Sequence, residues 1–543
     1  MSVVAAGQDW QPDGRQAAIE RLADAPALDL LIVGGGITGA GVLREAARRG
    51  WRSLLVEQRD FAWGTSSRSA RMIHGGLRYL SQGDIGLTRD AVVERERLMR
   101  EAPGLVEPLP FLYPVRRGQF PGRRAFSALL GLYDRFAGRS RRQWHSAEAL
   151  AWLLSGLRDD GLRGAVGYVD AMTDDARLVL RVLTEARSDG AQAVNYVQVV
   201  SLLRSDDRVF GAVLEDQVSG DRFELTARCV VNATGAWADR LRGEPDGTAR
   251  LRPLRGSHLV VPDWRLPVYQ AVTAPHPRDG RFVYIYPWAG RTVIGTTDLD
   301  HAGDLDDEAA ITAEEVDYLL ALVDDQFPTA GIGVGDVLST WSGVRPIVAP
   351  HGQDPLTIRP SRARRSHTVW SEHGLVTVTG GKLTTFRLMA LDVLRAAAAQ
   401  IGRPRRHAGD ERVFTPVACR PPDHVGIGTA RRLRGFYGAQ LPALIDSAET
   451  GMLEPVPGSD TLWAELAWAA GREAVVHLDD LLLRRTRLGV TLADGAADQE
   501  GRIAAICRRE LGWDKRRWRQ EWARYRDIYR RCYSLPSTGR GAR

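Results

Sequence analysis

The fold is decided by one stretch near the N-terminus, Ala27-Leu28-Asp29-Leu30-Leu31-Ile32-Val33-Gly34-Gly35-Gly36-Ile37-Thr38-Gly39. An unbroken apolar run that ends in a glycine-rich turn predicts a buried strand, and the small and apolar residues spaced over 40–49 predict a helix after it. A second short run, Ser53-Leu54-Leu55-Val56, ends at Glu57. Strand, turn, helix and second strand form a βαβ unit of the dinucleotide-binding kind.

Each residue type in this unit has a physical task. Gly34 makes the tight turn, Gly36 lets the backbone approach a pyrophosphate, and Gly39 lets the helix pack closely on the strand. The helix N-terminus attracts phosphate, and Glu57 can accept hydrogen bonds from an adenosine ribose. At this point the unit is compatible with either NAD or FAD.

The composition limits the class of protein. The chain has 543 residues, of which 44% are hydrophobic and 26% are charged, so we expect two or three globular domains. We find no apolar run of the ~18 residues that span a bilayer, and residues 1–26 lack the pattern of a signal peptide. The four cysteines form no CxxC pair, so we predict no metal site and a reducing cytoplasm.

The net charge of +6 is built almost wholly from arginine, because the chain has only two lysines, Lys382 and Lys515. The charge fits nucleic acid, an anionic membrane or an anionic substrate. A lysine that persists where arginine has taken most cationic positions is a candidate for a task that needs a compact ammonium group. We therefore single out Lys382.

The rest of the chain alternates between the two kinds of element. Apolar and polar spacing predicts helices at 177–186 and 383–399, a linker at 401–422 and helices from there onwards. It predicts strands at 194–203, 209–215, 229–232, 259–261, 282–286, 292–294 and 375–378.

A resemblance to a known family enters at Gly64-Thr65-Ser66-Ser67-Arg68-Ser69-Ala70-Arg71-Met72-Ile73-His74-Gly75-Gly76-Leu77-Arg78-Tyr79-Leu80. Together with Asn232-Ala233-Thr234-Gly235, Gly256-Ser257-His258, Gly295-Thr296-Thr297-Asp298, Ser342-Gly343-Val344-Arg345-Pro346 and Gly380-Gly381-Lys382-Leu383-Thr384-Thr385, it makes the chain similar to the FAD-dependent glycerol-3-phosphate dehydrogenases. Two departures are Arg71, where the family often has lysine, and Phe386, where it often has tyrosine.

The resemblance implies an α/β fold with FAD as the cofactor. It implies a glutathione-reductase-like Rossmann domain at 27–100, 165–250 and 340–400. An inserted α+β substrate domain, like that of D-amino-acid oxidase, would occupy 101–164 and 251–339, and an all-helical domain 410–543. The cofactor contacts it implies are Gly34, Gly36, Gly39, Glu57, Thr65, Ser66, Ser67, His74, Gly75, Gly76, Leu77, Ala233, Gly235, Gly381, Lys382, Leu383 and Thr384.

The resemblance also implies the reaction and its residues. Glycerol 3-phosphate would be oxidised to dihydroxyacetone phosphate, with His258, Lys382 and Arg345 as the catalytic residues and His258 as the candidate base. Two guanidinium groups suit the phosphate, because each offers a bidentate fork. The implied substrate contacts are Arg78, Tyr79, Thr297, Arg345 and Arg365.

Electrons would pass to a membrane quinone from a peripheral position on the inner face of the cytoplasmic membrane, and a homodimer is compatible with the family. Two segments in which aromatic and arginine residues alternate, 123–142 and 516–531, predict amphipathic helices that could lie on that membrane. One alternative is a soluble oxidase that uses O2. The other is a basic RNA-binding flavoprotein, but its arginines should gather in one stripe, whereas here they spread along the chain, so we expect no nucleic acid partner.

Overall fold

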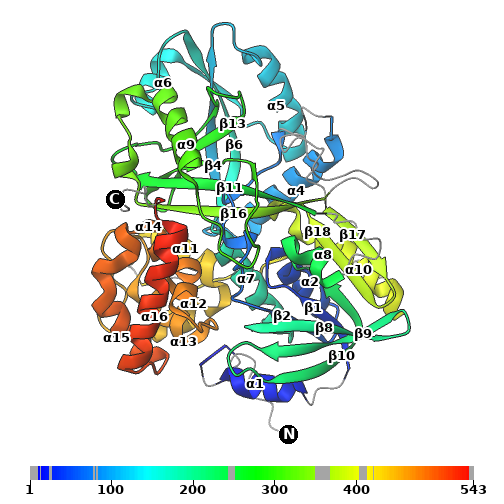
Figure 1. Cartoon of the computed structure of the whole chain (residues 1–543). Coiled ribbons are helices and arrows are strands. Elements are labelled where there is room, and N and C mark those ends of the chain that lie inside the picture. The colour runs from blue at the N-terminus through cyan, green and yellow to red at the C-terminus, as the bar shows by residue number, and fades with distance from the viewer. Residues whose placement is uncertain are drawn as a thin grey trace, which may run out of the picture.

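The computed structural model describes residues 10–12, 14–23, 27–77, 80, 83–242, 251–348, 367–402, 412–419, 421–422 and 424–536. Figure 1 shows three parts: a sheet with helices at the lower right, a second sheet in the upper half, and a helical region at the lower left. This arrangement confirms the predicted α/β class with a helical C-terminal region.

The first sheet is built around β1 (Leu28–Val33), the strand predicted from the apolar run. It runs parallel to β2 (Ser53–Glu57) on one side and to β10 (Arg222–Asn232) on the other. Further out lie β7 (Gln192–Asn195), β18 (Leu375–Gly380) and β17 (His367–Glu372), and β8 (Val197–Ser205) and β9 (Arg208–Asp216) extend β10 as a meander.

Both faces of β1 are covered, which explains why its sequence shows no alternation. Leu30 and Ile32 pack into a cluster with α2 (Ile37–Ala47), α7 (Asp175–Ser188) and α10 (Phe386–Ile401). Leu31 and Val33 face the other side, where α1 (Gly14–Ala23) and the β8–β9 meander cover them. The glycine loop that follows β1 therefore begins from a rigid, fully buried support.

The second sheet has ten strands. Its order is β15 (Leu299–Asp300), β11 (Leu251–Pro262), β14 (Arg291–Gly295), β13 (Phe282–Trp288), β12 (Ala271–Pro275), β4 (Val106–Arg116), β6 (Leu162–Thr173) and β3 (Met72–Ile73), with β16 (Ser339–Val348) beside β11 and β5 (Gln143–Ser146) beside β6. Strands β6 and β16 thus belong to the second sheet, and the predicted domain boundaries at 165 and 340 fall inside them.

The second sheet separates a packed face from a hollow face. On one side, α9 (Ala313–Gln326) and α6 (Ala147–Leu153) close a core around Leu112, Ile285 and Ile294. The other side is partly covered by α5 (Arg123–Ala137), which packs beside α4 (Ile85–Glu101). The uncovered remainder faces the first sheet.

The C-terminal region is helical, as predicted. Its helices are α11 (Ile427–Tyr437), α12 (Leu441–Asp446), α13 (Trp463–Arg472), α14 (Leu488–Thr491), α15 (Glu500–Glu510) and α16 (Lys515–Ile528), followed by a short helix η11 (Tyr529–Tyr533). Buried ion pairs tie this region to the first sheet: Asp60 bonds Arg484 at 2.5 Å and Arg485 at 2.6 and 2.7 Å. Many arginines therefore hold the parts together inside the molecule.

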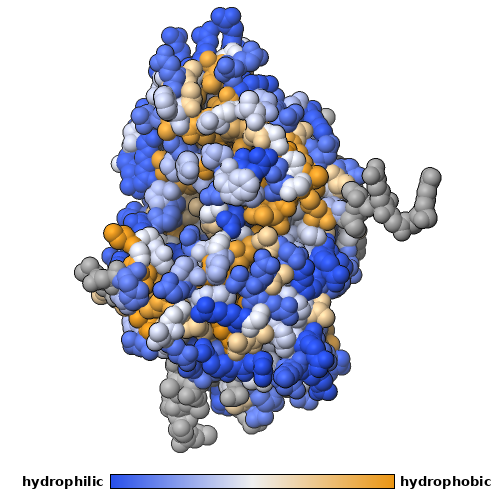
Figure 2. Space-filling model, turned by 90° about the vertical axis from the view of Figure 1, so that its left-hand side faces the viewer, coloured by the Kyte–Doolittle hydropathy of each residue, from blue (hydrophilic) through white to orange (hydrophobic). Residues whose placement is uncertain are grey.

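The prediction that the aromatic faces of two amphipathic helices lie on a membrane is wrong for most of these residues. On α5, Phe126, Leu130 and Tyr133 are buried against the second sheet. On α16, Trp518 and Tyr525 are buried within the helical region. Figure 2 shows a face that is hydrophilic along its top and lower edge, with hydrophobic patches between them. No helix in the described part of the chain is both long and apolar enough to span a bilayer.

Candidate active site

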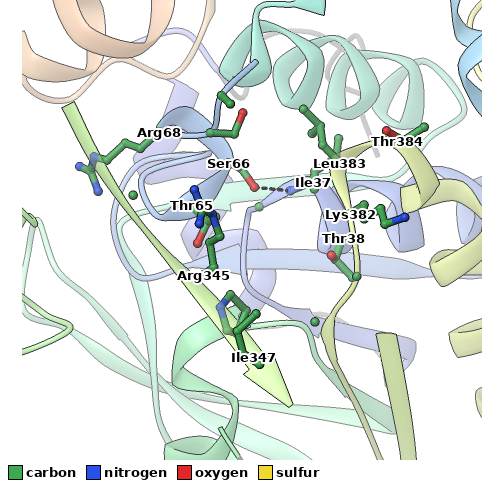
Figure 3. A pocket seen from close by; sticks show the side chains of 18 of the residues that line it. Ile37, Thr38, Thr65, Ser66, Arg68, Arg345, Ile347, Lys382, Leu383 and Thr384 are labelled. Atoms are coloured by element: carbon green, nitrogen blue, oxygen red, sulfur yellow. Dashed lines mark hydrogen bonds between the residues drawn. The ribbon is translucent and has the colours of Figure 1, made fainter. Parts of the chain in front are cut away.

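The glycine loop after β1 has the geometry of a phosphate-binding turn. Gly34 has φ +112°, and a Cβ there would lie 2.6 Å from the carbonyl oxygen of Ala233. A Cβ at Gly39 would lie 2.0 Å from the carbonyl oxygen of Gly34, so only glycine lets α2 approach the loop. The amide of Ile37 at the start of α2 donates to Ser66 Oγ at 3.0 Å (Figure 3). The loop therefore leaves room for a pyrophosphate beside a helix N-terminus.

Glu57 closes the end of β2 as predicted. Its carboxylate accepts hydrogen bonds from the amides of Gly35 at 2.6 Å and Arg59 at 2.9 Å. Burial raises the pKa of Glu57 above its usual value, although both amides oppose this. The two bonds fix the carboxylate at the wall of the cavity described next, where it can accept from ribose hydroxyls.

A cavity of about 1140 Å³ lies between the two sheets. Its volume is slightly above the usual range of about 300–1,000 Å³ for ligand sites, as a dinucleotide together with a small substrate requires. Of the predicted cofactor residues, Gly34, Gly36, Glu57, Thr65, Ser66, His74, Gly76, Leu77, Ala233, Gly235, Gly381, Lys382, Leu383 and Thr384 line it. Segments far apart in sequence thus meet around one space that fits FAD.

Three predicted cofactor residues do not line the cavity. Gly39 lies one turn into α2, where its contact is with Gly34. The side chain of Ser67 is buried. The amide of Gly75 donates to Tyr133 Oη at 2.8 Å and to Asp170 Oδ1 at 3.1 Å. These residues lie behind the loops that line the cavity and shape those loops.

Arg345 lies in the cavity wall, on β16. Its guanidinium group donates to Asp298 Oδ1 at 3.1 Å and to Thr296 Oγ1 at 2.9 Å. A Cβ at Gly256 on the neighbouring strand would lie 2.2 Å from Arg345 Nη2, so this glycine makes room for the guanidinium group. The fork is therefore held in place before any ligand arrives.

A second arginine, Arg281, also lines the cavity and was missed from the sequence. It donates to the carbonyl oxygens of Thr296 at 3.1 Å and Asp298 at 3.4 Å. Arg281 thus binds the backbone of this loop, and Arg345 binds side chains of the same loop. Two guanidinium groups at one loop favour an anionic ligand.

His258 and Thr297 are not among the residues that line the cavity. The Thr297 hydroxyl donates to Glu315 at 2.6 Å, on the far side of its loop, and the neighbouring Thr296 lines the cavity instead. The prediction that Thr297 faces the substrate is therefore not met in this conformation, because adjacent residues of the loop point to opposite sides.

The imidazole of His258 is fully buried and stacks on Trp341, with ring centroids 4.6 Å apart. Neither ring nitrogen has a hydrogen-bond partner among the described residues. Burial, and then the nearby guanidinium groups of Arg345 and Arg71, lower the pKa of His258 well below its usual value. The ring is neutral at physiological pH and lies behind the cavity wall.

Lys382 lines the cavity at the start of a short helix, η7 (Leu383–Thr385). Figure 3 shows its side chain pointing away from Arg345. Because its neighbours Gly381 and Leu383 are predicted cofactor residues that also line the cavity, we expect the ammonium group on the cofactor side. Three predicted substrate residues, Arg78, Tyr79 and Arg365, lie outside the described residues.

Further residues of the cavity wall were not predicted. At the end beyond Glu57 they come from β8 and from the turn after β10, and at the other end from the second sheet. They are Val197, Gln198, Val199, Trp63, Trp237, Arg240, Phe111, Tyr168, Asp170, Thr273, Tyr284, Thr296 and Asp298. Thr296 and Asp298 occur in a motif quoted above but were not predicted to face the cavity, and the other residues belong to no motif and are brought together by the fold.

Comparisons with known proteins place the chain among flavoproteins. A family model described as FAD dependent oxidoreductase matches residues 29–387, and one described as the C-terminal domain of alpha-glycerophosphate oxidase matches residues 418–518. Glycerol-3-phosphate dehydrogenase 2 of Mycobacterium tuberculosis is 36% identical over 540 residues, which cover 93% of this chain and 89% of that protein. The aerobic glycerol-3-phosphate dehydrogenase of Staphylococcus epidermidis is 33% identical, covering 84% of this chain and 86% of that protein.

Solved structures agree with these relatives. The crystal structure of the glycerol-3-phosphate dehydrogenase from Bacillus halodurans complexed with FAD is similar with a TM-score of 0.75 and 28% identity, over 96% of this chain and 98% of that one. L-alpha-glycerophosphate oxidase from Mycoplasma pneumoniae with FAD bound is similar in fold, with a TM-score of 0.53 and 17% identity over 70% of this chain and 96% of that one.

Proposed function

The chain belongs to the glycerol-3-phosphate dehydrogenases, a family of FAD-dependent oxidoreductases, and on this premise we propose that it oxidises sn-glycerol 3-phosphate to dihydroxyacetone phosphate. FAD is its cofactor. When bound, FAD accepts a hydride from the alcohol carbon and passes two electrons to an electron acceptor. The remaining tasks, which are to hold the phosphate, to accept a proton and to balance charge, fall to side chains of this protein.

One observation supports the substrate most strongly, the pair of arginines at the cavity wall. Arg345 presents a guanidinium group that Thr296 and Asp298 hold in a fixed orientation. Arg281 brings a second positive charge to the same loop. A fixed fork loses little side-chain entropy on binding a phosphate, and its hydrogen bonds are charge-assisted.

We propose His258 as the acceptor of the hydroxyl proton. Its neutral imidazole has a free nitrogen lone pair, and a Cβ at Gly295, next to Thr296 of the cavity wall, would lie 2.2 Å from the ring. A change of the Thr296 side chain or of the ring orientation would bring the imidazole to the substrate. Lys382, on the cofactor side, would stabilise the negative charge that develops as hydride leaves.

For the electron acceptor we propose a membrane quinone, reached from a peripheral position on the cytoplasmic face of the membrane. The exposed side chains of Phe120, Trp264 and Tyr269 offer aromatic anchors for such a position. One observation favours an oxidase that uses O2 instead: the family model that matches the C-terminal region is described as that of alpha-glycerophosphate oxidase.

The test uses the purified holoenzyme without oxygen. Glycerol 3-phosphate should bleach the flavin absorbance, and addition of a benzoquinone with an alkyl tail should restore it. Oxygen added in place of quinone should restore it slowly and with little peroxide. Failure of glycerol 3-phosphate to bleach the flavin would refute the substrate, whereas fast recovery with stoichiometric peroxide would identify an oxidase.

A further inference from the structure

One face of the second sheet carries a row of aromatic side chains. Phe111 and Tyr113 alternate along β4, so they point to the same face, and Phe111 lies opposite Tyr168 on β6. Tyr284 and Phe282 alternate along β13 in the same way. Their neighbours in sequence, such as Leu112 and Val283, point instead into the packed core under α9. All five aromatic residues line the cavity.

These rings touch one another and form a continuous surface. The ring of Phe111 stacks on Tyr168 at 5.0 Å and meets the edge of Tyr284 at 6.0 Å. Tyr113 meets Phe282 at 5.9 Å and stacks on Phe126 of α5 at 4.2 Å. Leu129 of α5 lines the cavity from the side of Phe126.

The aromatic surface has an inner and an outer end. At the inner end, Tyr168 is two residues from Asp170, which accepts from the amide of Gly75 in the loop that joins His74 to Leu77. At the outer end, Phe282 is 43% exposed and Phe120, in the turn before α5, is 88% exposed. The surface therefore runs from the cofactor loops to the solvent between α5 and β13, and we call it the aromatic passage.

The chemistry of the aromatic passage does not match glycerol 3-phosphate. That substrate is a small dianion, which gains nothing from stacked rings and loses hydration beside them. Dioxygen is so small that it needs no binding surface of complementary shape. Stacked aromatic rings and Leu129 suit a flat, apolar ring with an apolar tail, and they end at an exposed phenylalanine.

The charges around the outer end add a second argument. Arg117, Arg123 and Arg124 are exposed and lie within a few residues of Phe120. Exposed arginines beside an exposed apolar residue favour the anionic surface of a membrane, where a tailed quinone is dissolved. The aromatic passage is continuous with the cofactor cavity, and exposed arginines surround its outer end. Both features therefore indicate a tailed quinone as the occupant.

We propose that the aromatic passage admits a tailed quinone from the membrane to the reduced cofactor. The inference rests on the proposed function. In the balanced reaction, the substrate loses a hydride from its alcohol carbon and a proton from its hydroxyl group. The quinone gains two electrons and two protons and leaves as the quinol.

The test compares two variants of residues that line the aromatic passage with a control variant. Phe120→Ser and Leu129→Gln replace apolar side chains that line the cavity. Trp152→Ser removes an aromatic side chain that is 91% exposed on α6, on the opposite side of the second sheet, and that does not line the cavity. Each holoenzyme is assayed for anaerobic flavin bleaching by glycerol 3-phosphate, for reduction of a long-tailed benzoquinone in detergent, and for reduction of ferricyanide.

We expect the two variants to raise the KM for the tailed quinone by at least roughly fivefold, since each loses apolar contact of several tens of Å². Flavin bleaching, ferricyanide reduction and the control variant should match the parent. An unchanged quinone KM would overturn the proposal, as would an equal loss of flavin bleaching or an equal effect in Trp152→Ser. A parent protein that bleaches with substrate but forms peroxide instead of quinol refutes the proposed acceptor, a result that is read without any variant.

Discussion

Arg345→Ala tests the assignment of the phosphate anchor. Arg345 donates to Asp298 and Thr296 in the described structure, and it lines the cavity. A charge-assisted hydrogen bond to phosphate contributes about 1.5–3 kcal/mol. Loss of one such bond should lower kcat/KM for glycerol 3-phosphate by roughly 10- to 100-fold, at about 1.4 kcal/mol per factor of ten.

The effect should depend on the phosphate. With glycerol as the substrate the same variant should lose much less, because glycerol offers no dianion to the fork. Arg265→Ala is the control: this arginine forms a similar fork, to Asp336 at 2.5 and 3.1 Å, but lies at the surface away from the cavity. It should leave both reactions unchanged.

Stability has to be followed in parallel, because Arg345→Ala leaves the nearly buried Asp298 without this partner. Thermal unfolding of the FAD-loaded variant and its flavin absorbance report on this side effect. Equal losses on glycerol 3-phosphate and glycerol, with the flavin still bound, would refute the reasoning and give Arg345 a role in the cofactor site.

Three further predictions concern other parts of the site and its supports. Lys382→Arg should keep FAD bound yet slow anaerobic flavin bleaching at saturating substrate by at least ~10-fold, because a planar guanidinium cannot replace a compact ammonium; a rate close to the parent would show that charge alone suffices. Gly39→Ala should yield protein without FAD, since a Cβ would lie 2.0 Å from Gly34 O; normal flavin content would contradict this. Asp60→Asn should lower the free energy of unfolding by about 3–5 kcal/mol at neutral pH, as measured by denaturant titration. Although burial opposes the shift, Arg485 and Arg484 hold the pKa of Asp60 below 3.8. The stability that this carboxylate contributes is therefore complete above pH 3.8 and is lost as the pH falls through the lowered pKa. If the free energy of unfolding of the variant fell with acid in the same way as that of the parent, the assignment would be refuted.

The cofactor half of the site could be predicted from the sequence because its requirements are local. Gly34 and Gly39 are dictated by a turn and a close helix contact, and Glu57 by the length of one helix and one strand. Such constraints leave a pattern within one stretch of chain. The predicted residues that failed to reach the cavity, such as Gly75, still lie in the loops that surround it.

The substrate half could not be predicted in the same way, because it is set by pairing between distant strands. Adjacent residues of the chain point to opposite sides, so a shift of one residue decides whether Thr296 or Thr297 faces the cavity. His258 occurs in a motif, yet its depth follows from the packing of Trp341, which lies opposite it on β16. Arg281 has no local signature at all.

The two helices taken for membrane contacts show a different limit. An amphipathic helix with arginines on one side has the same sequence whether its apolar face meets lipid or protein. On α5 the difference lies in Tyr133, whose hydroxyl group accepts from Arg95 at 2.8 Å inside the molecule. That partner is 38 residues away in sequence and is not visible from the helix itself.

The bonds between the first loops and the last helices have a consequence for biosynthesis. Arg68, in the cavity wall, donates to Tyr533 Oη at 3.1 Å, and Asp60 is held by Arg484 and Arg485. A ribosome makes the glycine loop first and Tyr533 among the last described residues. The loops that line the cofactor cavity therefore gain these hydrogen bonds only when nearly the whole described chain has been made.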